Sequence, residues 1–459
     1  MLIDDTLKPA DLEKAIKRFW EVSEKKIQLI DREYDRSLGS PVYTRAGKYT
    51  TRGWTEWTEG FRYGSQILQF DATGEKEHLA AGRDNTLRYM APHLTHYGVH
   101  DHGFNNVSTY GNLLRLMREK KTEYDEWAAR YYELALKLSG AVQAMRWTEH
   151  KNGGFIYSFN GPHSLFVDTI RSCRSLVLSH SLGHVLMGEG DRRINLLERA
   201  FQHMRSTAEY SVYYGENRDT YDDWGRTVHE SIFNVNDGAY RCPNAQQGYS
   251  GYTTWTRGLS WAMCGFPEQL EYLNTVPDEE LEPLGGRETV ESVCLKAARA
   301  TCDFFIANTP TDGVCYWDCG APNLYRLGDY LNKPADPFNE WEPVDSTASA
   351  IGAQGLLRLG HYLRDKGDTQ VGDRYFQAGL SVVKTLLEEP YLSTDPSHQG
   401  LLLHSIYHRP NGWDYTPEEN KVHYGESSMW GDYHIRELVL LAHRLAADEP
   451  YYTFFNCLP

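Results

Sequence analysis

Hydrophobic residues recur at helical spacing near the start of the chain. Leu12, Ile16 and Phe19 fall on one face of a helix, and Ile27 and Ile30 follow, with charged residues between them. Steps of three and four residues are typical of an amphipathic helix that buries one side. We therefore expect a helix over this segment.

Similar periodic stretches recur along the rest of the chain, separated by loops rich in Gly, Asn, Asp and Pro. They predict about a dozen helices, including segments near 57–71, 78–95, 104–118, 124–145, 168–187, 191–212, 254–274, 287–308, 346–364, 370–388 and 430–446. Strand-like segments are short and few, and two examples lie at 153–160 and 313–318.

Long helices that alternate with loops, without a low-complexity linker, favour helical hairpins packed around a centre. We expect a single toroidal all-α domain over residues 1–459. A solenoid of helical repeats is the structural alternative, but no repeat of fixed period supports it. Several helices begin at or follow loops that carry Trp, His, Asp or Gln, and in a barrel of hairpins these loops would gather on one side.

Composition narrows the choice of partner. Aromatic residues make up 13% of the chain, with 12 Trp and 31 Tyr, which suits a pocket that stacks sugar rings but also a Tyr-rich core. The formal charge of −16 argues against nucleic acid or an anionic membrane surface as the partner. The N-terminal sequence has no apolar run, and no stretch approaches the ~20 apolar residues of a membrane span, so we expect a cytoplasmic protein. The eight cysteines form no Cys-x-x-Cys pair, and we expect free thiols.

Two aspartates have surroundings that are unusual for a surface carboxylate. Asp101 lies within His-Asp-His-Gly-Phe (100–104), immediately before a predicted helix. Asp168 follows the apolar residues 165–167, and burial there would raise its pKa and suit it to general acid catalysis. Both positions also fit a helix N-cap, which is the structural alternative.

Further side chains in the sequence are suited to a sugar pocket. They are Trp54, Trp57, His229, Gln246, Gln247, Trp255, Arg257 and Trp261. Indoles stack on sugar faces, amides bind hydroxyl groups, and an arginine can bind a carboxylate through two hydrogen bonds. The alternatives are tryptophans of the core and an arginine paired with an acidic residue of the chain.

Other kinds of site find little support. The two histidines of the 100–104 motif are spaced i, i+2, and no third ligand motif such as His-Glu-x-x-His is present, so we expect no metal and no other cofactor. The nucleophile motif Gly-x-Ser-x-Gly and the phosphate-binding P-loop are also absent from the sequence.

Several motifs, taken in order, resemble those of the unsaturated glucuronyl hydrolases, which form family 88 of the glycoside hydrolases and are related to the unsaturated rhamnogalacturonyl hydrolases of family 105. The resemblance runs from about residue 50 to residue 446. Its segments are TEWTEGF (55–61), HDHGF (100–104), FVDTI (166–170), QQGYSGYTTWTRGLSWAMCGF (246–266), DGVCYWD (312–318), DSTASAIGAQGLL (345–357) and MWGDY (429–433).

The resemblance implies an (α/α)6 barrel that needs no cofactor. It also implies removal of a 4,5-unsaturated uronic acid from the non-reducing end of oligosaccharides made by lyases, through hydration of the C4=C5 double bond. In the family scheme the residue matching Asp168 protonates C4 and helps water to add at C5. Asp101 matches the second aspartate, whose negative charge would keep Asp168 protonated.

The sugar contacts of the family carry over to this chain by position. Trp57, His229, Gln247 and Trp255 match residues that contact the unsaturated sugar. Gln246, Arg257 and Trp261 lie in the same motif, with less defined roles.

The chain departs from the family pattern at three places. Gln246 stands where a family member has His, Arg171-Ser172 replace an apolar residue and Asn, and 320–344 resembles an insertion that would serve as a lid or a subunit contact. We expect these changes to lie near the pocket and to affect substrate choice.

Three other functions remain open. An unsaturated rhamnogalacturonyl hydrolase shares the barrel and the acid chemistry but accepts a different aglycone. A polyuronate lyase on a similar helical toroid would use Tyr and His229 to abstract the C5 proton. A sugar-binding protein without catalysis is the third, and assembly into a homo-oligomer is compatible with each.

Overall fold

Two kinds of helix alternate along the chain in the computed structural model, which describes residues 1–52 and 56–456. Trp54 and Cys457 lie outside these residues. Helices with one buried face are α1 (Glu13–Glu33), α3 (Lys76–Tyr89), α6 (Glu126–Met145), α9 (Leu196–Tyr210), α12 (Arg287–Asn308) and α14 (Thr369–Leu386). More fully buried helices are α2 (Glu59–Thr73), α4 (His102–Asn106), α5 (Asn112–Arg118), α7 (Thr169–Ser172), α8 (Arg174–Ser181), α10 (Thr256–Leu273), α13 (Ser346–Asp365) and α15 (Met429–Ala446).

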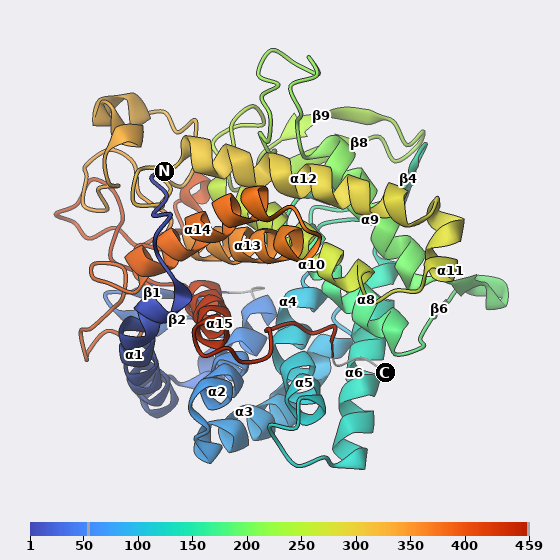
Figure 1. Cartoon of the computed structure of the whole chain (residues 1–459), viewed down its shortest axis with the longest axis horizontal. Helices are drawn as coiled ribbons and strands as arrows, with labels where there is room; N and C mark the ends of the chain where they lie inside the picture. Colours follow the sequence, from blue (N-terminus) through green and yellow to red (C-terminus); the bar gives the residue numbers. More distant parts are fainter. Residues whose placement is uncertain (53–55, 457–459) are drawn as a thin grey trace.

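The more fully buried helices close a ring. Contacts run from α2 through α4, α7, α10, α13 and α15 back to α2. The other helices cover this ring, and α1, α3, α6 and α12 lie at the edge of the molecule (Figure 1). The fold is therefore an all-α (α/α)6 barrel, as the sequence and the resemblance led us to expect.

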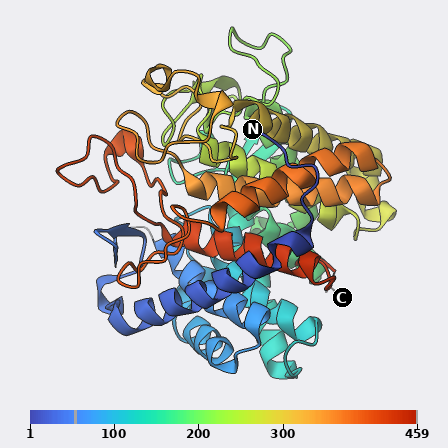
Figure 2. The same cartoon turned by 60° about the vertical axis from the view of Figure 1, so that its left-hand side comes forward.

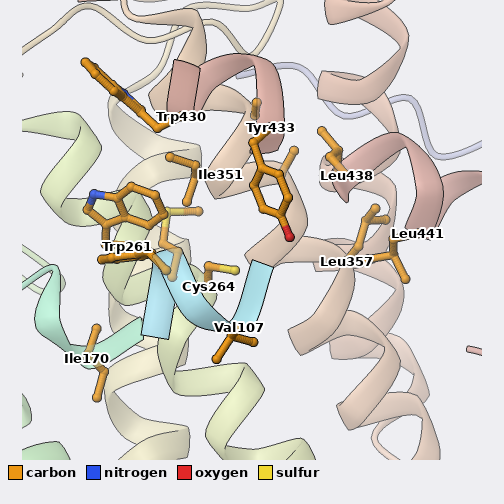
Figure 3. Close-up of a cluster of buried hydrophobic side chains, with 14 of the residues drawn as sticks. Val107, Ile170, Trp261, Cys264, Ile351, Leu357, Trp430, Tyr433, Leu438 and Leu441 are labelled. Carbon is orange, nitrogen blue, oxygen red and sulfur yellow. The ribbon is translucent and has the colours of Figure 1, made fainter. Parts of the chain in front are cut away.

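Side chains from the inner helices fill the centre of the ring. Trp261 and Cys264 of α10, Ile351 of α13 and Tyr433 of α15 belong to one cluster of buried side chains (Figure 3). This large cluster includes residues from both rings. The expectation of one domain over residues 1–459 stays a prediction. None of the helices in residues 1–52 and 56–456 is both long enough and apolar enough to cross a membrane.

The segments that connect the helices form small antiparallel sheets. They pair β1 (Tyr43–Arg45) with β2 (Lys48–Thr50), β3 (Trp147–His150) with β4 (Gly153–Ile156), β6 (Leu186–Met187) with β7 (Arg193–Ile194), and β5 (Ser164–Phe166) with β8 (Glu230–Phe233) and β9 (Tyr240–Asn244). In the three-stranded sheet Phe166 pairs with Glu230, and Val167 N–H donates to the carbonyl of His229 at 3.0 Å. This pairing brings the segment before Asp168 beside His229.

Several predicted elements differ from the structure. The expected helix over 168–187 is divided into α7 and α8 and ends at Ser181, because the chain turns at Gly183, whose φ is +77°. A π-helical turn at Val107–Gly111 interrupts the expected helix over 104–118. The expected strand at 313–318 is wrong: this segment is a buried loop that makes only isolated β-bridges.

Candidate active site

The N-terminal ends of the inner helices meet around one pocket. It is lined by Trp57, His100, Asp101, Phe104, Phe159, Asp168, Gln246, Gln247, Trp255, Arg257, Trp261, Tyr407, His408, Trp413 and Trp430. Loops gather on one side of the molecule, as predicted, and the long segment between α14 and α15, which supplies Tyr407, His408 and Trp413, is among them (Figure 2). The polar and aromatic side chains that the sequence suggested for a sugar site therefore largely lie together.

Asp101 and Asp168 hold equivalent places in the barrel. Asp101 precedes α4 and Asp168 precedes α7, and each is 8% exposed. Both occupy the N-cap position, but neither side chain accepts a capping hydrogen bond from its helix. Because the carboxylates are not used as caps, the structural alternative does not account for them.

A backbone contact fixes the two helices that follow these aspartates. Gly103 donates its N–H to Oγ of Ser172 at 2.9 Å. A Cβ atom on Gly103 would lie only 2.3 Å from the carbonyl oxygen of Ser172. Only glycine permits this approach, which brings the start of α4 against the end of the short helix α7.

His100 lies against both carboxylates. Its Nε2 is 3.4 Å from Oδ2 of Asp168 and 3.9 Å from Oδ1 of Asp101. The ring is buried beside Phe159 and Phe166, with centroid separations of 5.7 and 5.5 Å. Burial lowers the pKa of His100, but the two nearby carboxylates outweigh burial and raise it above its ordinary value.

The two carboxyl groups have pKa values shifted in opposite directions. Burial, together with the charge of Asp168, raises the pKa of Asp101. Burial also acts to raise the pKa of Asp168, but the hydrogen bond from His100 and the charges of His100 and His229 outweigh it, so that pKa is lowered. The predicted raised pKa of Asp168 is therefore wrong, because the sequence did not reveal the histidines that face it.

His100, Asp101 and Asp168 also have the chemistry of metal ligands. One nitrogen and two carboxylate oxygens lie within 4.8 Å of one another, which fits a small divalent cation. His102, the second histidine of the motif, is not part of this group, because its ring contacts Ser139 and the carbonyl of His96. The expectation of no metal cofactor stays a prediction.

His229 has a defined tautomer. Its Nδ1 accepts the backbone N–H groups of Gln246 and Gln247 at 3.0 and 3.1 Å. Burial lowers the pKa of His229 to about 4, so the ring is neutral near pH 7 and its proton is on Nε2. That buried Nε2–H has no partner among the described residues. His229 therefore offers a hydrogen-bond donor, and its Nδ1 fixes the loop that carries two predicted sugar ligands.

Arg257 is engaged within the protein. Its two terminal nitrogens donate to Asp345 at 2.7 Å, to Gln247 at 3.0 Å and to the carbonyls of Ile406 and Tyr407. The predicted bidentate contact to a substrate carboxylate is thus not supported, and the alternative, an arginine paired with an acidic residue, holds. Arg257 positions Gln247 and the 406–407 backbone.

Indole rings form the walls of the pocket. Trp57 stacks on Trp430 with centroids 5.3 Å apart, and Trp255 lies 4.6 Å from the ring of His229. Trp261 packs against Phe104 at 4.7 Å. Trp430 belongs to the MWGDY motif, which is the signal in the sequence that could have identified it. Phe159, Tyr407, His408 and Trp413 lie in loops without such a signal.

Asp318 is a buried anchor that the sequence analysis did not identify. It is fully buried, and burial raises its pKa to about 6. Its carboxylate accepts the N–H groups of Tyr249 and Gly320, both at 2.8 Å, and the hydroxyl of Thr253 at 3.1 Å. Asp318 thereby holds the loop that follows Gln247.

The departures at residues 171–172 do not line the pocket. Arg171 is buried in the core, where it binds Glu268 at 3.0 Å, Glu437 at 2.6 Å and Gln354 at 2.8 Å. Ser172 holds Gly103, as described above. Both residues thus lie near the pocket, as expected, but behind its lining: Ser172 contacts Gly103, and the guanidinium of Arg171 lies 5.9 Å from the ring of Trp261.

The 320–344 stretch packs on a loop of the pocket. Glu342 binds Arg409 at 3.3 Å, and Glu340 binds Lys421 at 2.6 Å. Glu342 also accepts the indole N–H of Trp317 at 2.8 Å. These contacts place the stretch behind the segment that supplies Tyr407, His408 and Trp413.

Comparisons with known proteins agree with the resemblance. No family model matches the chain. It is 23% identical over 391 residues to an unsaturated glucuronyl hydrolase of Formosa agariphila, covering 83% of this chain and 78% of the relative. It is 21% identical over 450 residues to an unsaturated chondroitin disaccharide hydrolase of Streptococcus pyogenes, covering 95% and 92%.

A solved structure shares the fold. The crystal structure of the unsaturated glucuronyl hydrolase of Streptococcus agalactiae matches with a TM-score of 0.69 at 20% identity, covering 93% of this chain and 91% of that chain. The resemblance that the motifs suggested is thus confirmed over most of the chain.

Proposed function

We propose that this chain is an unsaturated glucuronyl hydrolase, a glycosidase that removes a 4,5-unsaturated uronic acid from the non-reducing end of oligosaccharides made by lyases. The observation that carries this proposal is the meeting of Asp101 and Asp168, two buried carboxylates without capping roles, in a pocket walled by indoles. The names of the relatives support the same substrate class.

The reaction needs one proton donor and one water molecule. A proton from the aspartate pair adds to C4, the water oxygen adds to C5, and the proton lost by the water returns to the pair. The hemiketal at C5 then opens and leaves a hemiacetal at C1, from which the aglycone departs as an alcohol. The pair ends the cycle with the proton count with which it began.

We assign the catalytic proton to the pair rather than to Asp168 alone. Asp101 has the raised pKa and Asp168 the lowered one, so the two groups hold one proton more readily than two or none. Trp57, Trp255 and Gln247 would bind the sugar, and the Nε2–H of His229 would donate to it.

The geometry of His229 disfavours the lyase alternative. A base must present an unprotonated nitrogen to the C5 proton. In His229 Nδ1 already accepts two backbone N–H groups, and Nε2 carries the proton. The substrate of an unsaturated rhamnogalacturonyl hydrolase differs only in the aglycone. An assay with both kinds of substrate therefore distinguishes the two activities.

The test follows the ultraviolet absorbance of the conjugated C4=C5 double bond. Purified protein is mixed with unsaturated disaccharides from chondroitin, heparin and rhamnogalacturonan lyases, and separately with intact polyuronates. Loss of absorbance from a disaccharide supports the hydrolase and ranks the substrates. A rise in absorbance from intact polymer would make the protein a lyase and overturn the proposal.

We further propose a cytoplasmic location. All seven cysteines within the described residues are free thiols, as in proteins of a reducing compartment. Cell fractionation with an antibody to the protein tests this, and recovery from the medium or periplasm would contradict it.

A further inference from the structure

A row of large apolar side chains is exposed along one face of α6. The row begins at Tyr124, two residues before the helix. The exposed fractions of these side chains are 66% for Tyr124, 78% for Trp127, 39% for Tyr131, 53% for Leu134, 38% for Leu138 and 59% for Met145. With Ala141, these positions follow one another at steps of three and four residues. This is the a/d spacing of a helix that packs lengthwise against another helix.

The row points away from the barrel. Ala129 and Leu136, on the opposite face of α6, are buried against the core. Figure 1 shows α6 at the edge of the molecule. No residue of α6 lines the pocket among the described residues, so this surface is separate from the proposed active site.

The size of the row exceeds that of an ordinary surface patch. Six side chains of this kind, about half exposed, present roughly 700 to 800 Å² of mostly apolar surface. The largest apolar patch on a monomer is usually about 300–600 Å². A stable protein interface buries about 800 Å² on each partner, so this row is about as large as one half of a dimer interface.

We propose that two copies of this chain form a dimer by packing α6 against α6 in antiparallel orientation across a two-fold axis. The N-terminal half of the row is aromatic, with Tyr124, Trp127 and Tyr131, and the C-terminal half is aliphatic. Antiparallel packing places each aromatic ring against an aliphatic side chain of the other copy. Bulky and smaller groups then interdigitate, and the same patch serves both copies.

The charges beside the row are compatible with this pairing. Glu126, Arg130, Glu133 and Lys137 flank it, so both signs are present along the helix. Two copies therefore do not bring a surface of one sign against itself. An anionic membrane surface is a poorer partner, because the chain carries a formal charge of −16.

Sedimentation velocity of the full-length protein tests the dimer. We expect wild type to sediment at twice the chain mass of 52.7 kDa. Leu134→Glu and, independently, Trp127→Glu should each raise the dissociation constant by about 100-fold or more. Both side chains are exposed in the single chain, so these variants should still fold, with a circular dichroism spectrum like that of wild type, and any fall in Tm should be no larger than loss of association accounts for. Tyr325→Glu, which changes a side chain that is 70% exposed elsewhere, is the matched control and should remain dimeric.

Two results would overturn the proposal. One is a wild-type protein that stays monomeric up to the highest soluble concentration. The other is an assembly that persists in both α6 variants, which would place the interface elsewhere. Activity is measured in parallel: loss of dimer with retained turnover separates this surface from the proposed function.

The orientation has its own test. In a Cys242→Ser background, which removes an exposed thiol, Tyr131→Cys and Leu138→Cys chains, whose positions face each other across the proposed two-fold axis, are mixed and oxidised. Antiparallel packing predicts that the mixed disulfide forms at least about tenfold faster than the disulfide within either variant. Faster cross-linking within each variant alone would indicate parallel helices and overturn the antiparallel arrangement.

Discussion

His100 holds Asp168, but not Asp101, at hydrogen-bonding distance, with Nε2 3.4 Å from Oδ2 of Asp168 and 3.9 Å from Oδ1 of Asp101. This asymmetry makes two equally buried carboxylates chemically unequal. Burial raises the pKa of Asp101, whereas the hydrogen bond from His100 helps to lower that of Asp168. A pair of this kind can keep one proton at a pH at which an exposed carboxyl group has lost it.

Replacement of Asp168 by Asn should abolish turnover without unfolding the protein. The amide preserves the shape but cannot exchange a proton with C4 or with water, so we expect kcat to fall by about 10³-fold or more. Absorbance of an unsaturated disaccharide measures turnover, and thermal unfolding of the same sample measures stability. Activity close to that of wild type would remove Asp168 from the mechanism.

Asp101→Asn should lower turnover and raise stability at neutral pH. Folding raises the pKa of Asp101 above its ordinary value of 3.8, so the folded state binds the proton more tightly than the unfolded chain. The stability that comes from this protonation is present below pH 3.8 and is lost as pH rises through the folded-state pKa. Asn removes this loss, so we expect Tm to exceed that of wild type by about 1–3 °C at pH 8.

The gain in Tm from Asp101→Asn should shrink as the pH falls toward 4, because the raised pKa of Asp101 makes the protonated fraction of the folded wild type grow as pH falls. Equal Tm differences at pH 4 and pH 8 would show that this carboxyl group does not have a raised pKa.

Two substitutions of His229 separate its two nitrogens. His229→Asn keeps an acceptor near the position of Nδ1 but removes the Nε2–H, so kcat/KM should fall by about 10- to 100-fold with the loop in place. His229→Gln keeps a donor near the position of Nε2 but loses the acceptor for the N–H groups of Gln246 and Gln247. We expect its main defect to be a lowered Tm and a raised KM.

Measurement of kcat, KM and Tm for both His229 variants decides between these roles. Retention of wild-type kcat/KM by His229→Asn would show that the Nε2 donor has no part in the reaction.

Arg171→Ala should destabilise the fold without changing KM. Arg171 is fully buried and binds Glu268 and Glu437, so truncation leaves two buried carboxylates with one cation fewer. We expect a loss of about 3–5 kcal/mol in the free energy of unfolding, measured by denaturant titration. Arg18→Ala is the control: its ion pair with Glu388 is exposed and should contribute less than about 1 kcal/mol. A raised KM with unchanged stability would place Arg171 at the pocket after all.

The periodic pattern predicted most helices because burial of one face or of all faces leaves a repeat in the sequence. The failures have local causes. The segment 313–318 has the apolar composition of a strand, but its polar groups bond to the barrel, and Asp318 anchors a loop. Residues distant in sequence set the pKa of Asp168, and an isolated segment cannot reveal them. The loop that supplies Tyr407 and Trp413 carries no periodicity at all.

The order of the family-like motifs along the chain predicted more of the pocket residues than did the chemical character of single side chains. It identified Trp57 and Gln247, which line the pocket, whereas the role suggested for Arg257 from its charge alone is not supported by its contacts within the protein. An arginine in a motif can bind a ligand or an acid of its own chain, and only the position of Asp345 decides between these partners.

The main chain sets the spacing between Asp101 and Asp168, because Gly103 is in contact with Ser172. Asp101 lies two residues before Gly103, and Asp168 lies four residues before Ser172, the two positions at which the backbones are in contact. Any side chain at position 103 would push α4 from α7 and separate the carboxylates, whichever residues line the pocket. Substitution of the indoles that line the pocket can therefore change its shape while the spacing of the two acids, set by the main chain at Gly103, stays the same.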